Sequence, residues 1–408
     1  MIWSLFTDLA IATNILSYRS LDFFFTLVIL VGLSRWMKRK EPFLGSIFAE
    51  FPILNLCVCA FILIAALGYL TYNSTLMSAA EDIFSLRWIA ALYASIYLGI
   101  LLRQASPKWS LTSPLLPFIL TVLLLIYLFH PNRDIISSER RLLIFYQNTN
   151  HLALALLFPW ALYLGNFSLE KKMFSFRTIP CVLGLMLLSL AILFTYSRSA
   201  WFGMIIAGIF ALVYSRQRLL IYCTMVAVAF CAFCYLTNAF YIQDRVNYTF
   251  DFSEASSQNS RLVAWEAYGR MFLEHPLLGV GLENSNNFQT KYYDQMNTPE
   301  ILRSGHAHNQ FLQILAGVGI FGFISYYAII FTAYIFFHRH FYKAKSESSK
   351  KMALAGVLII VSMLCASITD TPTRIAEGRN YALLLLGLAA GFLKKDDLEL
   401  RNHEPRKS

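Results

Sequence analysis

The chain has 408 residues, of which 57% are hydrophobic and only 14% charged, and its mean hydropathy is +0.53. A soluble protein of this length could not bury so much apolar surface, so the composition excludes a soluble globular enzyme and indicates a polytopic membrane protein. The net charge of +10 comes mostly from short loops between apolar segments, which indicates a topology signal and not a nucleic-acid-binding surface.

Apolar segments of about 17–25 residues, the length of a membrane-spanning helix, occur along most of the chain. They predict helices at 20–37, 51–72, 85–102, 113–129, 150–165, 178–196, 199–215, 218–237, 309–337, 351–369 and 379–393. Residues 1–18 form either a further span or an interfacial helix. We therefore expect an all-α polytopic membrane protein with 11–12 transmembrane helices.

Basic residues predict the orientation of these helices. Alternate short loops and the C-terminal segment hold 21 of the 34 lysines and arginines. The positive-inside rule assigns these segments to the cytoplasm and the remaining loops to the outer face. The chain then divides into N-terminal transmembrane helices (1–237), one large outer loop (238–308), C-terminal transmembrane helices (309–393) and a cytoplasmic tail (394–408).

The large outer loop contains an amphipathic segment at 261–275. We expect a helix there, with Ser260 as its cap and Pro276 as its stop. The spacing of Trp265 and other apolar side chains suits a helix lying against the membrane surface. A tight turn at 276–281 then returns the chain toward the membrane.

Two histidines, His306 and His308, close the outer loop directly before the helix predicted from Asn309. Histidine is the side chain best suited to proton transfer near neutral pH, so the pair is a candidate base at the membrane surface. A structural pair at a helix start is the alternative interpretation. Zinc would need further ligands, and the outer segments have no cysteine and no clear ligand cluster, so we expect no metal.

Arginine dominates the basic residues assigned to the outer face, where twelve of thirteen are arginines. The planar guanidinium suits bidentate binding of phosphate, which indicates a phosphate-bearing ligand. Arg198 lies in a very short junction between two apolar helices, where it either binds such a ligand or extends toward the interface. Asn148 and Asn150, before the helix at 150–165, either cap it or bind a sugar.

Five short motifs together resemble the O-antigen ligase family, which includes O-antigen polymerases and protein O-oligosaccharyltransferases. In chain order they are Asn148-Thr-Asn150-His151-Leu-Ala, Ser197-Arg198-Ser-Ala-Trp, Ser260-Arg261-Leu-Val-Ala-Trp265, His275-Pro276-Leu-Leu-Gly279-Val-Gly281, and His306-Ala-His308-Asn309 followed by Gly317-Val-Gly319. The resemblance covers roughly 145–330. Thr149 departs from it, because the family often has proline there.

The resemblance implies a metal-independent glycosyltransferase with a GT-C-like helical fold, in the bacterial inner membrane, whose large loop is periplasmic. The donor it implies is O-antigen linked to undecaprenyl diphosphate. For a ligase the acceptor is the lipid A–core saccharide, and the product is complete lipopolysaccharide. No cofactor and no nucleic acid is expected.

Glycosyl transfer from a diphosphate needs a base for the acceptor hydroxyl and cations for the leaving group. We expect His308 to be the general base and Arg198 and Arg261 to bind the diphosphate. Further candidates for substrate contacts are His306, Arg303, Asn309, Asn148, Asn150 and Trp265. An O-antigen polymerase and a protein O-oligosaccharyltransferase are alternative enzymes, and a polysaccharide transporter is an alternative of another class.

Overall fold

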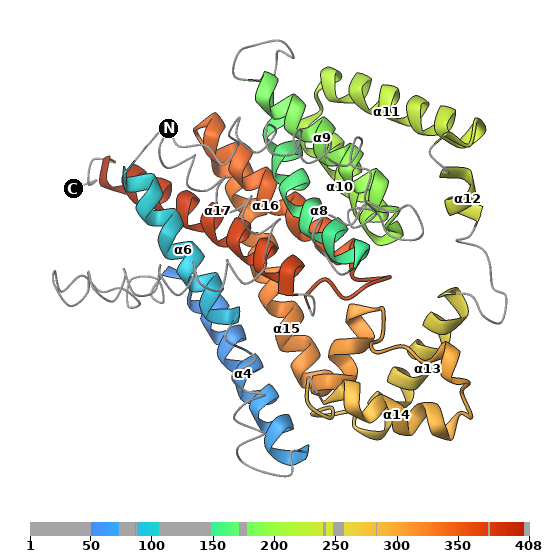
Figure 1. Ribbon diagram of the computed structural model, residues 1–408. Coiled ribbons are helices and arrows are strands. Elements are labelled where there is room, and N and C mark those ends of the chain that lie inside the picture. The colour runs from blue at the N-terminus through green and yellow to red at the C-terminus, as the bar shows by residue number, and fades with distance from the viewer. Residues whose placement is uncertain are drawn as a thin grey trace.

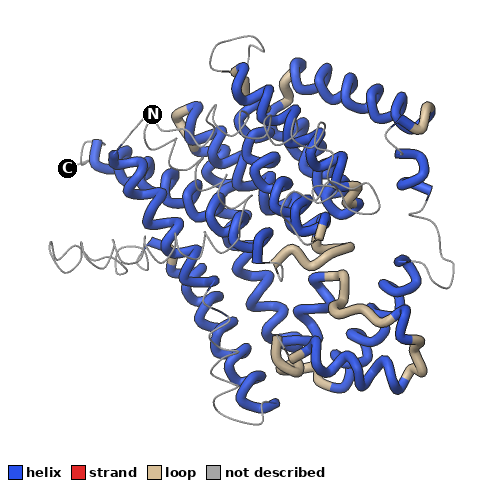
Figure 2. The backbone as a smooth tube through the Cα atoms, in the orientation of Figure 1, coloured by secondary structure: helices blue, strands red, loops and turns tan. Residues whose placement is uncertain are grey.

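The computed structural model describes residues 50–72, 86, 88–105, 148–170, 178–239, 242–247, 257–282, 284–373 and 376–403. Within these ranges the regular structure consists of helices alone (Figure 1), and Figure 2 shows only helices and the loops between them. The predicted all-α class is therefore confirmed. The helices predicted at 20–37 and 113–129, and residues 1–18, lie outside the described residues, so the count of 11–12 spans stays a prediction.

The described helices follow the predicted apolar segments closely. In the first half they are α4 (Pro52–Tyr72), α6 (Trp88–Ala105), α8 (Thr149–Phe167), α9 (Ile179–Thr195), α10 (Arg198–Ser215) and α11 (Arg218–Leu236). In the second half they are α12 (Ile242–Asn247), α13 (Ser257–Glu274), α14 (Ser285–Gln295), the short 3-10 helix η5 (Glu300–Leu302), α15 (Gln310–Lys343), α16 (Glu347–Ala366) and α17 (Ala376–His403).

Four of the described helices are long and apolar enough to cross a membrane: the greater part of α4, and all of α10, α15 and α16. Shorter apolar helical stretches occur in α6, α9 and α11. These spans confirm a polytopic membrane protein. Inside the bundle, α16 packs against α8, α10, α15 and α17, and α17 packs along α6.

A small helical lobe, formed by α13, α14 and η5, lies at the lower right of Figure 1, against the start of α15. Its core contains the fully buried Tyr268, Met271 and Tyr292, with Ala307 and Ala316 from the chain that enters α15. The lobe corresponds to the second half of the predicted outer loop. Because Tyr268 is buried within it, α13 uses part of its apolar face for the lobe itself.

The prediction of Ser260 as the helix cap is wrong. The α13 helix begins three residues earlier, at Ser257, so Ser260 lies inside it. Its hydroxyl donates instead to the Leu302 carbonyl, 2.9 Å away, and this hydrogen bond connects α13 to η5. The predicted stop is confirmed, because the helix ends at Glu274, before Pro276.

The lobe is fixed to α15 through backbone contacts between two glycine-containing motifs. The Val280 and Gly281 amides donate to the carbonyls of Ala316 and Gly317, at 3.0 and 2.8 Å. In return, the Ile320 amide donates to the Pro276 carbonyl at 2.8 Å. This exchange is possible because the α15 helix breaks at Gly319, whose φ of 61° is readily reached only by glycine.

Candidate active site

The two predicted histidines lie side by side in the loop that precedes α15. Their ring centroids are 3.9 Å apart, at an interplanar angle of 43°. His308 has a φ of 48°, a left-handed conformation that is uncommon for a side chain of this size. Between them Ala307 is fully buried, and its amide donates to the Gln313 side chain at 3.1 Å. The buried Ala307 and its hydrogen bond to Gln313 therefore hold the loop in one conformation on its inner side.

Two further contacts fix this loop to the bundle. Asn309 is the N-cap of α15, because its side-chain oxygen accepts from the Leu312 amide at 3.1 Å. The backbone amide of the next residue, Gln310, donates to the Ser367 backbone carbonyl at 2.8 Å. The start of α15 is thus joined to the α16–α17 connection, which Figure 2 draws as a tan loop between the bundle and the lobe.

The α16–α17 connection supplies a third polar group beside the histidines. Asp370 is only 2% exposed, and its carboxylate accepts the Thr371 amide at 2.8 Å. One carboxylate oxygen and one ring nitrogen from each of His306 and His308 lie within 4.8 Å of one another. Two imidazoles and a carboxylate can in principle hold a metal ion, so the expectation that the outer segments supply no ligand cluster is wrong.

The junction that carries Arg198 reaches the same place. Tyr196 ends α9 in a left-handed conformation, and α10 begins at Arg198 after a single intervening residue. The hydroxyls of Ser197 and Ser199 lie 3.0 Å apart, and Ser199 donates to the Asp370 carboxylate at 3.5 Å. The fold thus brings the start of α10, the acid and the histidine pair together.

The other predicted substrate contacts are placed by different interactions. The Arg303 guanidinium is 2.7 Å from Asp294 and donates to the Thr298 carbonyl at 3.1 Å, so it is engaged within the lobe. Asn148 caps α8 by accepting the Asn150 amide at 2.8 Å. The contacts of the described residues join neither Arg303 nor Asn148 to the histidines.

Arg261 and Trp265 lie on α13, whose Val263 packs in the same apolar cluster as Ala307. Both residues are partly exposed. The indole nitrogen of Trp265 is buried without a hydrogen-bond partner among the described residues, which leaves it as a donor for a ligand oxygen. The roles of all nine predicted site residues stay predictions.

Hydrogen bonds inside the lobe hold the histidine loop from its other side. The Tyr293 hydroxyl donates to the Ser304 carbonyl at 3.1 Å, and burial raises the pKa of this phenol, so it stays a neutral donor. Glu274 accepts from Lys291 at 2.9 Å and from the Tyr292 hydroxyl at 2.8 Å. These two hydrogen bonds lower the pKa of the Glu274 carboxyl and join α13 to α14.

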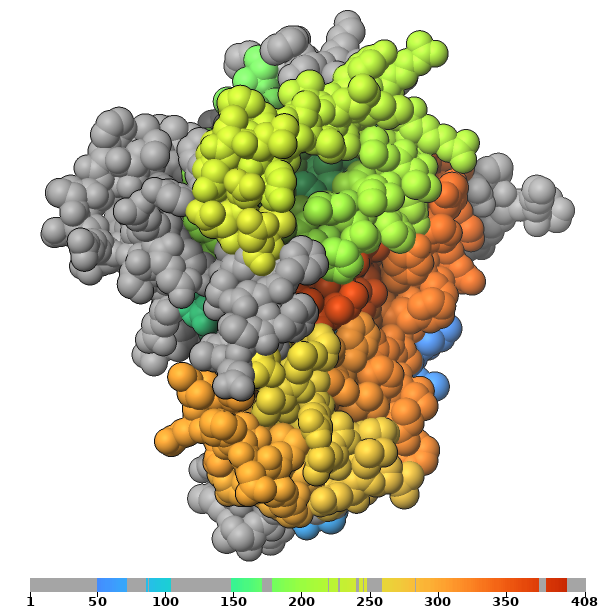
Figure 3. All heavy atoms as spheres, turned by 90° about the vertical axis from the view of Figure 1, so that its right-hand side faces the viewer, coloured from blue at the N-terminus to red at the C-terminus, as the bar shows by residue number. Residues whose placement is uncertain are grey.

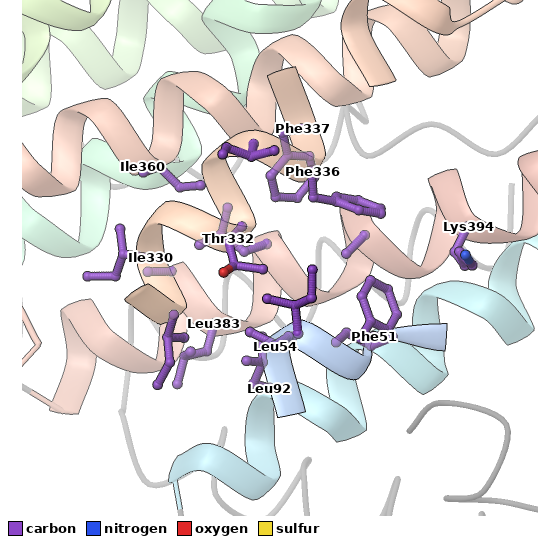
Figure 4. Close-up of a pocket in the computed structure, with 18 of the residues that line it drawn as sticks. Phe51, Leu54, Leu92, Ile330, Thr332, Phe336, Phe337, Ile360, Leu383 and Lys394 are labelled. Carbon is purple, nitrogen blue, oxygen red and sulfur yellow. The ribbon is translucent and has the colours of Figure 1, made fainter. Parts of the chain in front are cut away.

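An apolar cavity of about 370 Å³ lies between α4, α6, α15 and α17 (Figure 4). Side chains such as Leu54, Ile330 and Leu383 line its middle (Figure 4). Thr373 and Arg379 belong to its lining, and both also line a second, small cavity beside Gln310 and Gln313. The apolar cavity therefore extends toward the segment that carries Asp370.

Sequence reasoning missed Asp370. The signal available was modest: Asp370 is one of two acids, with Glu377, in the segment between the helices predicted at 351–369 and 379–393, which the predicted topology places on the outer face. Figure 3 shows red-orange atoms of the C-terminal part of the chain at the surface, between the green helices and the yellow and orange lobe. Only the fold reveals that this segment meets residues more than 60 positions earlier.

These features define a polytopic, all-helical membrane protein with a histidine–aspartate site at one end of its helices. Residues 183–327 match the family model described as O-antigen ligase. The predicted resemblance to that family is therefore confirmed, over a region that contains Arg198, Arg261, His306 and His308. No curated protein matches the chain.

Proposed function

We propose that the protein is an inverting, metal-independent glycosyltransferase of the GT-C type. It transfers O-antigen from undecaprenyl diphosphate to the lipid A–core saccharide at the periplasmic face of the inner membrane, which completes lipopolysaccharide. One observation carries this proposal: His306 and His308 lie close to Asp370, and the start of α10 reaches the same carboxylate through Ser199. The two histidines and the start of α10 lie in the region that matches the family model.

The location of these groups supports a reaction at the outer face. Arg216, directly after α10, and Lys343, at the end of α15, lie at the opposite ends of helices that begin at the site. Lys351 lies in the second turn of α16, whereas Asp370 follows the other end of this helix. By the positive-inside rule the basic ends are cytoplasmic, so the histidines are periplasmic.

The chemistry requires three operations. His308 removes the proton of the acceptor hydroxyl, whose oxygen attacks the anomeric carbon of the donor glycan. The bond from that carbon to the phosphate oxygen breaks, and the lipid diphosphate leaves with the electron pair. Arg198 and Arg261 bind the diphosphate and stabilise its growing negative charge. A single displacement of this kind inverts the anomeric configuration.

The remaining predicted residues surround this reaction. Trp265 offers its indole N–H to a sugar oxygen, and His306 lies against the base. Arg303, Asn309, Asn148 and Asn150 contribute further substrate contacts or hold their segments in place. The apolar cavity of Figure 4 supports a donor that carries a hydrocarbon chain, because apolar side chains dominate its lining.

The test is complementation of a strain that lacks the gene. His308→Ala is expected to leave the protein in the membrane but to abolish capping, so that bare lipid A–core and lipid-linked polymer accumulate. His340→Ala is the matched control, because His340 lies at the other end of α15. Normal O-antigen ladders with His308→Ala would contradict the proposal.

The same strain separates the related activities. Loss of a polymerase would leave single glycan repeats on the core, whereas loss of a ligase leaves the core bare. Loss of glycan from a pilin or another protein acceptor would indicate a protein O-oligosaccharyltransferase. Movement of lipid-linked glycan by the purified protein, without glycan transfer, would indicate a transporter.

A further inference from the structure

The apolar cavity of Figure 4 has cations at the end opposite to the histidines. Arg339 and Lys343 of α15 and Lys394 of α17 belong to its lining. The Lys394 amine lies 2.7 Å from the Glu50 carboxylate, so this cation has a partner. Arg339 and Lys343 are exposed and form no ion pair with the described part of the chain. This end of the cavity therefore carries positive charge that needs an anion from outside the protein.

The cavity is elongated along α17. The lining residues of this helix recur every three or four positions on one face, at Arg379, Leu383, Leu386, Ala390 and Lys394. At about 1.5 Å per residue they extend over roughly 22 Å, against a membrane hydrocarbon core of about 30 Å. This shape suits a hydrocarbon chain lying alongside the helix.

The two ends of the cavity differ in how their cations are used. At the outer end Arg379 donates to the Thr373 carbonyl at 3.4 Å and lies over the Trp88 ring, 5.9 Å from its centroid. The donor of the proposed reaction has its diphosphate at the outer face, so its chain would enter there. The end that Arg339 and Lys343 line is cytoplasmic by the positive-inside rule, and the donor diphosphate does not reach it.

The inner end has the two properties of a lipid site. Its walls are apolar, with Leu54 and Ile330 among the lining residues and the rings of Phe51 and Phe336 5.5 Å apart. Water finds no polar partners among such side chains, and an empty apolar cavity is costly, so hydrocarbon is the suitable filling.

The charges at this end select the head group. Arg339 and Lys343 are four residues apart on α15, so their side chains leave the helix on the same face. A guanidinium binds phosphate oxygens in a bidentate manner, and an ammonium adds a compact positive charge. Basic pockets between transmembrane helices on the cytoplasmic side are typical of sites for anionic lipid head groups.

We propose that the inner end of this cavity binds an anionic phospholipid of the cytoplasmic leaflet. One acyl chain lies among the apolar side chains of α4, α15 and α17, and the phosphate lies between Arg339 and Lys343. The site is separate from the histidines and takes no part in glycan transfer. It ties the start of α4 to the inner ends of α15 and α17 through a bound lipid.

The experiment is native mass spectrometry of the purified full-length protein, titrated with phosphatidylglycerol or with phosphatidylethanolamine. We expect wild type to bind phosphatidylglycerol more tightly. The double variant Arg339→Gln, Lys343→Gln should bind it about 30-fold more weakly, because each cation near an anionic lipid contributes about 5-fold. Its affinity for phosphatidylethanolamine, which has no net charge, should change little.

The matched control is the double variant Arg218→Gln, Lys345→Gln. It removes the same charge from exposed positions on the same side of the membrane, and neither residue lines the cavity. It should bind phosphatidylglycerol as wild type does. If the first double variant fails to fold, Lys343→Gln alone should weaken binding about 5-fold.

A second variant tests the chain and leaves the cations in place. Thr332 lies among the cavity side chains in Figure 4, so Thr332→Phe should fill part of the space. We expect it to weaken phosphatidylglycerol binding, which attraction to surface charge alone would not explain.

Three results would overturn the proposal. The first is equal affinity of the cavity variant and its matched control for phosphatidylglycerol. The second is displacement of the lipid by glycerophosphate alone, which would indicate a phosphate site without a chain. The third is displacement by undecaprenyl phosphate, which would assign the inner end to the donor chain. No glycan transfer is measured, so a failure here leaves the proposed function standing, and an inactive coupling assay leaves this site standing.

Discussion

The contact between the lobe and α15 predicts a specific sensitivity at Gly279. This residue has a φ of 65°, and a Cβ added to it would lie 2.5 Å from the Gly317 carbonyl carbon and 2.6 Å from the Ala316 oxygen. These are backbone atoms, so no side chain can rotate away. A left-handed alanine costs about 1–2 kcal/mol, and the overpacking costs a further ~1–3 kcal/mol. Gly279→Ala should therefore destabilise the protein by about 2–5 kcal/mol, a large share of a typical folding free energy.

Gly269 provides the matched control, because it lies within α13 and a Cβ added there would meet nothing within 4 Å. Gly269→Ala should stabilise its helix by about 0.5–1 kcal/mol. The assay is thermal unfolding of both purified variants, together with their rates of glycan transfer. We expect Gly279→Ala to lower both the melting temperature and the rate, because the displaced lobe moves the His308 loop. Equal melting temperatures for the two variants would show that the close contact between Gly279 and the α15 backbone does not contribute to stability.

Three further predictions concern charge, pH and stereochemistry. Arg198→Lys should lower kcat/KM for the lipid-linked donor by about 10-fold or more without changing thermal stability, because lysine lacks the bidentate fork; an unchanged value would remove Arg198 from the diphosphate site. The pKa of Glu274 is lowered in the folded lobe, so its stabilisation is complete above the ordinary carboxyl pKa and is lost as the pH falls through the folded value. Limited proteolysis should therefore show the α13–α14 pair loosening in acid for wild type, with a weaker pH dependence for Glu274→Gln. NMR of the new linkage should show an inverted anomeric configuration, whereas retention would contradict a single in-line displacement by the acceptor oxygen.

The helices were largely predictable because hydropathy determines them directly. The segment predicted at 199–215 is α10 at 198–215, and that predicted at 218–237 is α11 at 218–236. Errors arose where tertiary contacts decide. Serine is a common helix cap, but the Ser260 hydroxyl donates to the Leu302 carbonyl of η5 instead. The long α15 helix looked uniform, yet Gly319 breaks it to accept the backbone of the 276–281 turn.

The site was predictable in part. The position of His306 and His308 before an apolar helix, and of Arg198 at a short junction, follows from local sequence alone. Asp370 does not, because its hydrogen bond to Ser199 joins residues 171 positions apart. A single acid in an outer loop is an ordinary surface feature until the fold buries it. Arg303 differs in the opposite way: the sequence predicts it as a substrate contact, but in the fold it forms an ion pair with Asp294 within the lobe.

The central claim is that His308 is the base for glycosyl transfer at the outer end of the bundle. Its most direct test is the initial rate of coupled product formed by purified His308→Ala, from lipid-linked glycan and core acceptor, beside His340→Ala. We expect a loss of about 10²–10⁴-fold for His308→Ala, the usual contribution of general base catalysis, with a normal rate for His340→Ala. A His308→Ala rate equal to that of wild type would contradict it.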